Sequence, residues 1–145
     1  MKQINVRKIE ITDYPEIHTL NGELGHECSI EKVKDRIEYI TENTKDVILV
    51  AQQGNEVIGY IHGSPYELLY SDSLINILAF VVKEKYRSIG IGSRLLSYLE
   101  DWAKENGYCG IRLVSRFERI DAHRFYLNHG YINRKNQKYF IKMFE

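Results

Sequence analysis

The chain has 145 residues, of which 43% are hydrophobic and 28% charged, a composition typical of one folded domain. Its 20 basic and 20 acidic residues balance, and a zero net charge excludes a protein that binds nucleic acid over its whole surface. No apolar run approaches the roughly 18 residues of a membrane span, and the two isolated cysteines, Cys28 and Cys109, favour a reducing compartment over a disulfide scaffold or zinc site. We therefore expect a single domain over residues 1–145, in the cytoplasm, with no metal and no membrane contact.

The first half of the chain predicts a strand, two helices and a hairpin. Pro15 in a first turn indicates a helix start, and Ser29 is a typical N-cap for a second helix. Gly54 lies between two β-rich runs, as in a hairpin connection. The expected elements are a strand at 4–9, helices at 12–24 and 29–40, and strands at 47–51 and 56–62.

The second half continues as a mixed α/β pattern. Residues 74–82 are almost continuously apolar, which predicts a central strand buried on both faces. After it we expect a helix at 91–106, a strand at 110–114, a helix at 121–129 and a final strand at 138–144.

A glycine-bearing turn joins the central strand to the next helix. Its sequence is Arg87-Ser88-Ile89-Gly90-Ile91-Gly92. Glycines at the start of a helix let backbone N–H groups approach a phosphate, although a strand-to-helix turn can need glycine for its geometry alone. The third glycine of a dinucleotide fingerprint and the Gly-Lys-Ser/Thr of a P-loop are both missing, which disfavours NAD and ATP.

A second block of sequence lies further along the chain: Ala122-His123-Arg124-Phe125-Tyr126-Leu127-Asn128-His129-Gly130-Tyr131. Its order and separation relative to the glycine turn are those of a known pair of family signatures. With the glycine turn, it resembles the GNAT superfamily of acetyl-CoA-dependent N-acetyltransferases. The resemblance implies a mixed, largely antiparallel sheet with two splayed central parallel strands, flanked by helices. It implies acetyl-CoA as co-substrate, bound by the backbone of Phe80, Val81 and Val82 along pantetheine and of Arg87, Ser88, Ile89, Gly90, Ile91, Gly92 and Ser93 around the pyrophosphate.

Tyr126 is the expected catalytic residue. In the resemblance it lies near the thioester sulfur, where a phenol can protonate the departing CoA thiolate as a general acid. A packing role is the alternative in a chain with 11 tyrosines. Arg119 stands where the family often has an asparagine that contacts the cofactor, and it could serve a phosphate or be a solvated arginine at a helix start.

The general base is not assigned by the sequence. The central strand is apolar where many family members carry an acidic base. Glu23, His26 and Glu27 fall in the connection that lines the acceptor site in this fold, so they are candidates for substrate binding or base catalysis. His62 and Glu67 are further candidates, whereas His123 and His129 more often pack or face solvent.

The leading interpretation is an acyltransferase that moves an acetyl group to a primary amine of a small molecule or peptide. A non-catalytic acyl-CoA-binding sensor or interaction module is the alternative, and an RNA-binding domain is least favoured because aromatic-interleaved basic motifs are missing. The acceptor amine stays open, and a homodimer is possible.

The neutral total conceals two oppositely charged parts. Residues 1–80 hold seven basic and thirteen acidic side chains, and residues 81–145 hold thirteen basic and seven acidic ones. Lys83, Lys85, Arg87 and Arg94 surround the glycine turn. We expect this basic part to attract the polyanionic CoA and the acidic part to suit a cationic amine.

Overall fold

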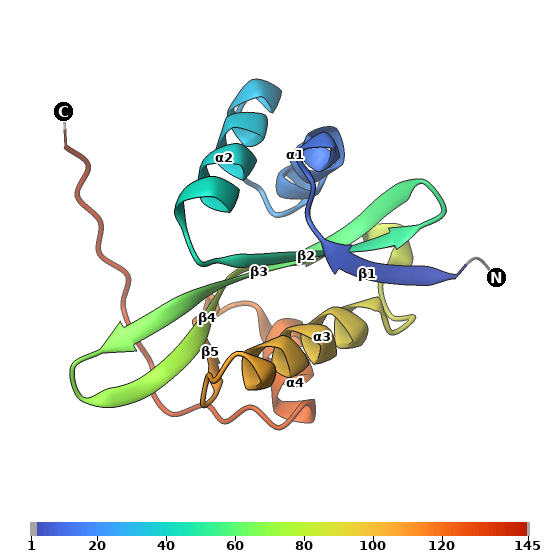
Figure 1. The fold of residues 1–145 in the computed structure, drawn as a ribbon. Helices are drawn as coiled ribbons and strands as arrows, with labels where there is room; N and C mark the ends of the chain where they lie inside the picture. Colours follow the sequence, from blue (N-terminus) through green and yellow to red (C-terminus); the bar gives the residue numbers. More distant parts are fainter. Residues whose placement is uncertain (1–2, 145) are drawn as a thin grey trace. The chain divides into compact units, whose positions relative to one another are not determined.

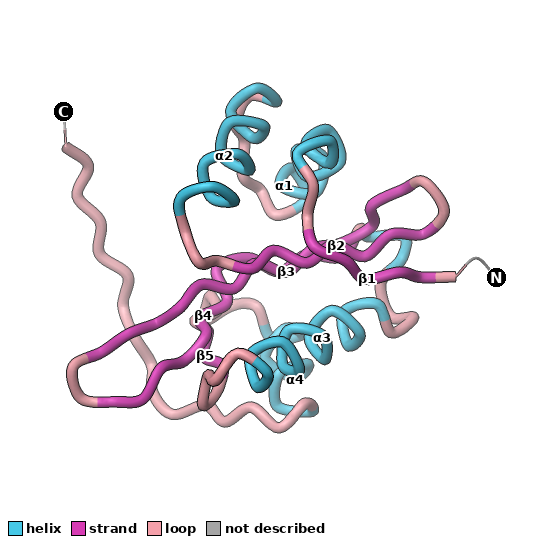
Figure 2. The backbone as a smooth tube through the Cα atoms, in the orientation of Figure 1, coloured by secondary structure: helices cyan, strands magenta, loops and turns pink. Residues whose placement is uncertain are grey.

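A computed structural model describes residues 3–144, which form two compact units. The first unit ends at Leu113 and contains a sheet with three helices, and the second begins at Val114 and contains one helix. Figures 1 and 2 show the helices and strands of each unit. The expectation of a single domain stays a prediction.

The first unit is organised around a five-stranded mixed sheet whose strands lie in the order of the sequence. Neighbouring strands are antiparallel, except for the last pair, which is parallel. The strands are β1 (Ile4–Lys8), β2 (Val47–Gln53), β3 (Glu56–Leu68), β4 (Ser71–Val82) and β5 (Ile111–Leu113). All five were expected from the sequence, and the β3–β4 hairpin is longer than its apolar runs indicate.

Three helices belong to the first unit, and their starts follow local sequence signals. The helices are α1 (Tyr14–Glu23), α2 (Ile30–Asn43) and α3 (Ile91–Glu105). Ser29 caps α2, since its hydroxyl accepts a hydrogen bond from the N–H of Lys32 at 3.1 Å. Pro15 lies in the first turn of α1, where a missing N–H costs nothing. Short 3-10 turns, η1 (Ile11–Asp13) and η2 (Glu84–Tyr86), precede α1 and α3.

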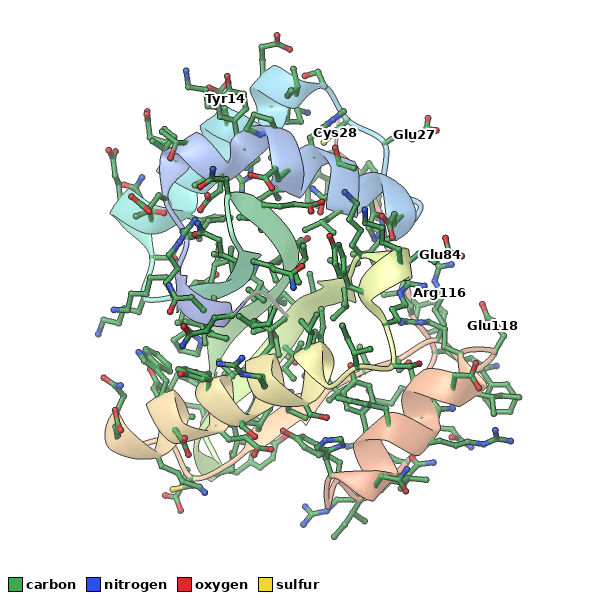
Figure 3. The ribbon with its side chains drawn as sticks, turned by 90° about the vertical axis from the view of Figure 1, so that its right-hand side faces the viewer. Tyr14, Glu27, Cys28, Glu84, Arg116 and Glu118 are labelled. Atoms are coloured by element: carbon green, nitrogen blue, oxygen red, sulfur yellow. The ribbon has the colours of Figure 1, made fainter. Side chains whose placement is uncertain are left out.

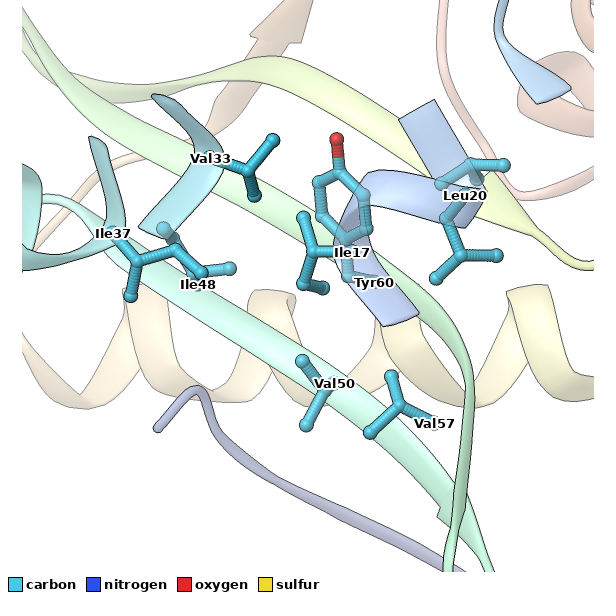
Figure 4. Packing of buried hydrophobic residues seen from close by; sticks show 9 residues of the cluster. Ile17, Leu20, Val33, Ile37, Ile48, Val50, Val57 and Tyr60 are labelled. Carbon is cyan, nitrogen blue, oxygen red and sulfur yellow. The ribbon is translucent and has the colours of Figure 1, made fainter. Parts of the chain in front are cut away.

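The helices cover the sheet on opposite faces, with α1 and α2 on one face and α3 on the other (Figure 1). Figure 4 shows the core between the sheet and the first two helices, where Ile17 and Leu20 of α1 meet Val33 and Ile37 of α2. On the other face, close approach of α3 requires glycine in β3. A Cβ at Gly63 would lie 2.8 Å from Ile75 and 3.1 Å from Leu99.

Strand β4 changes its facing direction in the middle. Ala79 pairs with His62 and Ile77 pairs with Gly63, so Leu78 is an extra residue in a β-bulge. Ile75 packs toward α3, whereas Ala79 packs against the α1–α2 core.

The prediction of a strand buried on both faces is therefore wrong. Leu78 is 54% exposed, and the pattern along β4 is a partial alternation. The apolar run is continuous because the bulge turns the residues before and after it toward opposite helix layers. It does not mean that the whole strand is buried on both faces.

The parallel pairing between β4 and β5 is short. It covers only Ile75–Ile77 on β4, which continues for five residues to Val82. The expected parallel pair is confirmed, and β5 is the edge strand of the described sheet.

The second unit contains α4 (Ile120–Asn128) followed by irregular backbone. The predicted strand at 138–144 is wrong: within the described residues no strand pairs with it, and its large side chains, such as Tyr139 and Phe144, are more than 80% exposed. Alternating apolar residues favour a strand, but a strand forms only where another strand accepts its hydrogen bonds.

Candidate functional site

The turn between β4 and α3 exposes the backbone that the sequence singled out. Gly90 has φ 91° and Ser88 has φ 66°, both in the left-handed region. This conformation is easy for glycine and costs roughly 1–2 kcal/mol for serine, so a tight turn is imposed here. Because α3 begins at Ile91, its first N–H groups have no acceptor inside the helix. Such a terminus, with its positive dipole end, suits an anionic group.

The backbone of β4 next to this turn is divided between two edges. The N–H of Lys83 donates to the carbonyl of Ile58 at 2.8 Å, so alternate residues, including Val81, direct their backbone groups toward β3. Phe80 and Val82 direct theirs toward the β5 side, past the end of the β5 ladder. Of the three residues expected to pair with pantetheine, these two have the suitable orientation, and Val81 instead contributes its side chain to the core.

Glu23 is the last residue of α1, and its side chain contacts the segment that leads into the glycine turn. Its Oε1 accepts a hydrogen bond from the N–H of Glu84 at 2.8 Å and lies 3.4 Å from Nη2 of Arg87. The Nε of Arg87 donates to the carbonyl of Val82 at 2.7 Å. Glu23 thus ties the end of α1 to the glycine turn.

Neighbouring acids partly neutralise the positive charge around the turn. Lys83 pairs with Glu56 at 2.6 Å, and the hydrogen bond that Lys83 donates to this carboxylate raises the pKa of Lys83. Arg87 faces Glu23 in the same way. The attraction of this segment for a polyanion is therefore weaker than its basic residues alone suggest.

Tyr126 lies on α4 in the second unit and is half-buried. Its ring centroid is 5.8 Å from that of Tyr131 and 5.5 Å from that of Phe125. Burial raises the pKa of Tyr126 above its ordinary value, and the charge of Arg119 opposes this rise. The phenol is consequently protonated at neutral pH and able to donate.

The other sequence candidates of the second unit make local contacts. Arg119 is the N-cap residue of α4. His123 Nε2 lies 2.8 Å from the carbonyl of Arg116, and His129 Nδ1 lies 2.7 Å from the carbonyl of Phe125.

A pocket of about 410 Å³ lies between α1, α2 and the sheet of the first unit. Aliphatic side chains make up half of its lining residues, and the polar ones include Lys32 and Arg36 of α2 and Tyr60 and His62 of β3. The Tyr60 hydroxyl donates to Oδ1 of Asn21 at 2.5 Å, and burial raises the pKa of Tyr60 to about 12. The Nε2 of His62 lies 2.8 Å from Oδ2 of Asp46.

The remaining candidates lie outside this pocket. His26 and Glu27 are exposed in the connection between α1 and α2, where Figure 3 labels Glu27 beside Cys28. Of this connection, only Cys28 lines the pocket. Glu67 lies near the end of the β3–β4 hairpin and accepts a hydrogen bond from the Ser73 hydroxyl at 2.7 Å.

Asp46 and Asn21, the partners of the pocket residues His62 and Tyr60, were missed by sequence reasoning. Asp46 immediately precedes β2, and Asn21 lies in α1, so each reads locally as an ordinary polar residue. Their partners, His62 and Tyr60, are 16 and 39 positions away. Only knowledge of the β2–β3 register and of the α1 packing could have identified the pairs.

Neither a metal cluster nor a membrane-spanning helix occurs in the part of the chain that the structure describes. No group of three or more His, Cys, Asp or Glu residues there is arranged to hold a metal ion. None of the helices formed by residues 3–144 is long and apolar enough to cross a membrane.

Comparison with known proteins gives consistent results. The profile of the Acetyltransferase (GNAT) family matches residues 6–131. The uncharacterized N-acetyltransferase YhdJ of Bacillus subtilis is 28% identical over 126 residues, covering 87% of this chain and 86% of that protein. The aminoalkylphosphonate N-acetyltransferase of Salmonella typhimurium is 35% identical over 83 residues, or 57% of this chain and 54% of the relative. Among solved structures, the aminoglycoside N-acetyltransferase AAC(6')-Iy in complex with CoA superposes with a TM-score of 0.88 at 14% identity, covering 98% and 96% of the two chains, and shares the fold.

Proposed function

Because the chain belongs to the GNAT family of acetyltransferases, and is thus an acetyl-CoA-dependent N-acetyltransferase, we propose that it acetylates the primary amine of a small molecule and that Tyr126 protonates the departing thiolate. The observation that carries the proposal is the glycine turn at the start of α3, which directly follows a strand that extends past its parallel neighbour.

The residues around the turn fit a pantetheine arm that ends in a pyrophosphate. The edge groups of Phe80 and Val82 would pair with the amides of the arm. The backbone from Arg87 to Ser93 would surround the pyrophosphate, with positive φ at Ser88 and Gly90 shaping the turn. The Nε of Arg87, which donates to Val82, would then have to release that carbonyl.

The reaction needs a neutral amine, because an alkylammonium has no lone pair for attack on the thioester. As the amine nitrogen bonds to the carbonyl carbon, negative charge develops on the oxygen, and a backbone N–H in the 78–80 stretch of β4 would stabilise it. When the C–S bond breaks, the Tyr126 phenol would give its proton to sulfur. A raised pKa supports this role because it keeps the donor protonated before the step.

Two relatives support a small acceptor. One is named for aminoalkylphosphonates and another, similar in fold, for aminoglycosides. Both classes are small amines. The 410 Å³ pocket has a volume suited to a molecule of this kind.

A CoA-release screen tests the proposal. The panel contains 2-aminoethylphosphonate, neamine, spermidine, several amino acids and a peptide with a free lysine. We expect acetyl-CoA to raise the melting temperature and at least one small amine to release CoA. A thermal shift with no release from any amine would contradict the proposed activity and favour an acyl-CoA-binding module.

The Tyr126→Phe variant tests the acid. We expect turnover to fall by about 10²-fold or more, because a positioned proton donor contributes roughly 10²–10⁴ in rate, while acetyl-CoA affinity is retained. Tyr139→Phe is the matched control, since Tyr139 is 82% exposed in the same unit and should behave as the wild type. Full turnover by the Tyr126 variant would remove this residue from the acid role.

A further inference from the structure

We propose that His62, oriented by Asp46, is the general base that removes the proton from the acceptor ammonium in the pocket between α1, α2 and the sheet. This assignment rests on the proposed function. It gives the reaction a base in a chain whose central strand carries no acidic side chain at 77–82.

His62 lies on the wall of the pocket rather than in closed packing. It belongs to β3 and has Ile48 of β2 and Ala79 of β4 as cross-strand neighbours. Ile48 and Ala79 both pack with the α1–α2 core, so the imidazole faces the same side. The side chains of His62 and Asp46 are 13% and 11% exposed, and of the two His62 lines the pocket while Asp46 contacts its ring.

Asp46 fixes the chemical state of the ring. A carboxylate can only accept, so Nε2 of His62 must carry the hydrogen that bridges the 2.8 Å to Asp46. In the neutral ring the lone pair is then on Nδ1, which is the nitrogen that can take a proton while Asp46 holds the ring in this orientation. This is the arrangement expected of an oriented base.

The pair is also next to the reacting part of β4. Ala79, directly across from His62, follows the bulge at Leu78, and Phe80 begins the edge that would hold pantetheine. Side chains opposite each other on neighbouring strands have Cβ atoms roughly 5 Å apart. An amine in the pocket can therefore reach His62 and a thioester beside the bulge together.

The ammonium nitrogen loses two protons for each acetyl group that it accepts. Nδ1 of His62 takes one proton from the ammonium, and the neutral nitrogen forms the C–N bond. Cleavage of the C–S bond then gives a thiolate, which is protonated by Tyr126, and the second excess proton on nitrogen returns through water to the tyrosinate. The imidazolium passes its proton to solvent, so one proton is released per acetyl group transferred.

Other ionisable groups share the pocket and could contribute to its pH dependence. They are Cys28 from the α1–α2 connection, Lys32 and Arg36 from α2, and Tyr60 from β3. Tyr60 stays protonated through neutral pH because burial raises its pKa to about 12. Lys32 and Arg36 disfavour a further positive charge in the pocket, which favours proton loss from a bound ammonium.

The test measures kcat/KM from pH 6 to 9.5 for His62→Gln, with the fastest acceptor of the CoA-release panel. At pH 7 we expect a loss of about 10²–10⁴-fold, with the melting shift caused by acetyl-CoA unchanged. The loss in kcat/KM should become smaller as pH rises. At higher pH more of the amine is already neutral in solution, so the reaction depends less on a base in the enzyme. Asp46→Asn, which keeps the ring, should give a smaller loss with the same pH trend.

His18→Gln is the matched control, because His18 is a histidine of the same unit that does not line the pocket and whose Nε2 lies 2.9 Å from the carbonyl of Cys28, and we expect its activity to stay within about twofold of the wild type. Full activity of His62→Gln, or a loss that is constant across the pH range, would overturn the inference and leave the pair as a tie between β2 and β3. If His62→Gln does not fold, Asp46→Asn decides by the same criterion. A wild type that acetylates no amine would instead refute the proposed function itself.

Discussion

The Gly59→Ala substitution tests whether the geometry of the β4 edge controls cofactor binding. A Cβ at this position of β3 would lie 2.9 Å from the carbonyl oxygen of Val81 and 3.4 Å from Cα of Val82. Real Cβ atoms do not approach backbone this closely, so β4 must move by about 0.5 Å to restore ordinary contact. The Cβ would also press on Leu95 of α3 at 3.3 Å, which limits movement in the other direction.

The magnitude follows from two opposing effects. Overpacking costs typically about 1–3 kcal/mol, and replacing glycine returns about 0.5–1 kcal/mol of chain entropy. We expect a net destabilisation of about 1–2 kcal/mol, or about 3–8 °C in melting temperature. If the displaced Val82 weakens one hydrogen bond to pantetheine, CoA affinity should fall about 2–10-fold.

Urea unfolding and calorimetric titration with CoA measure both effects. Gly22→Ala is the matched control, because Gly22 lies within α1 and a Cβ there meets nothing within 4 Å. It should stabilise the protein by about 0.5–1 kcal/mol and leave CoA binding unchanged. If Gly59→Ala were stabilised like the control and bound CoA normally, the close approach of β3 and β4 would not constrain the edge.

Two further predictions concern charged contacts. Glu23→Ala removes the acceptor of the Glu84 N–H and the carboxylate beside Arg87, and we expect the loss of order in the turn to outweigh the gain in positive charge, so that CoA binding weakens by about 5-fold in a calorimetric titration. Glu23→Gln keeps an acceptor and should lose less, and equal or tighter binding by Glu23→Ala would contradict the role of this contact. Burial is the largest influence on the pKa of Asp13 and would raise it, but the hydrogen bonds from Arg7, the hydrogen bond from the N–H of Glu10 and the charge of Arg7 together outweigh burial and lower that pKa. These contacts therefore stabilise the fold above the unfolded-state pKa near 4, and their contribution is lost as pH falls through the folded value. Asp13→Asn should therefore cost about 2 kcal/mol in urea unfolding at pH 7, with a gap to the wild type that narrows below pH 4, and a gap independent of pH would refute this.

Features set by nearby residues could be predicted from the sequence. The cap at Ser29 depends on a contact three residues away, and the turn at Gly90 depends on the glycine itself. Both appear in the structure where the sequence indicated them. The family signatures added the expected roles of Tyr126 and the turn, which stay predictions for this chain.

Features set by distant pairing could not be predicted. The contact of Glu23 with Arg87 joins residues 64 positions apart, and the sequence indicated only an acid near the acceptor side. The bulge at Leu78 depends on a mismatch in register between β3 and β4, which leaves no local signal. The expected strand at 138–144 was wrong for a related reason, because alternation does not supply the neighbouring strand.

The bulge at Leu78 makes the length of β4 more important than the chemistry of the bulged side chain. Ile75 before it packs with the α3 layer and Val81 after it packs with the α1–α2 layer, so one strand serves both hydrophobic cores. Substitutions at this exposed position leave both sets in place. Deleting Leu78 would reverse the facing direction of the residues on one side of the bulge, so their apolar side chains would leave the hydrophobic layer in which they pack. Selection on this strand should therefore tolerate many amino acids at position 78 but very few insertions or deletions.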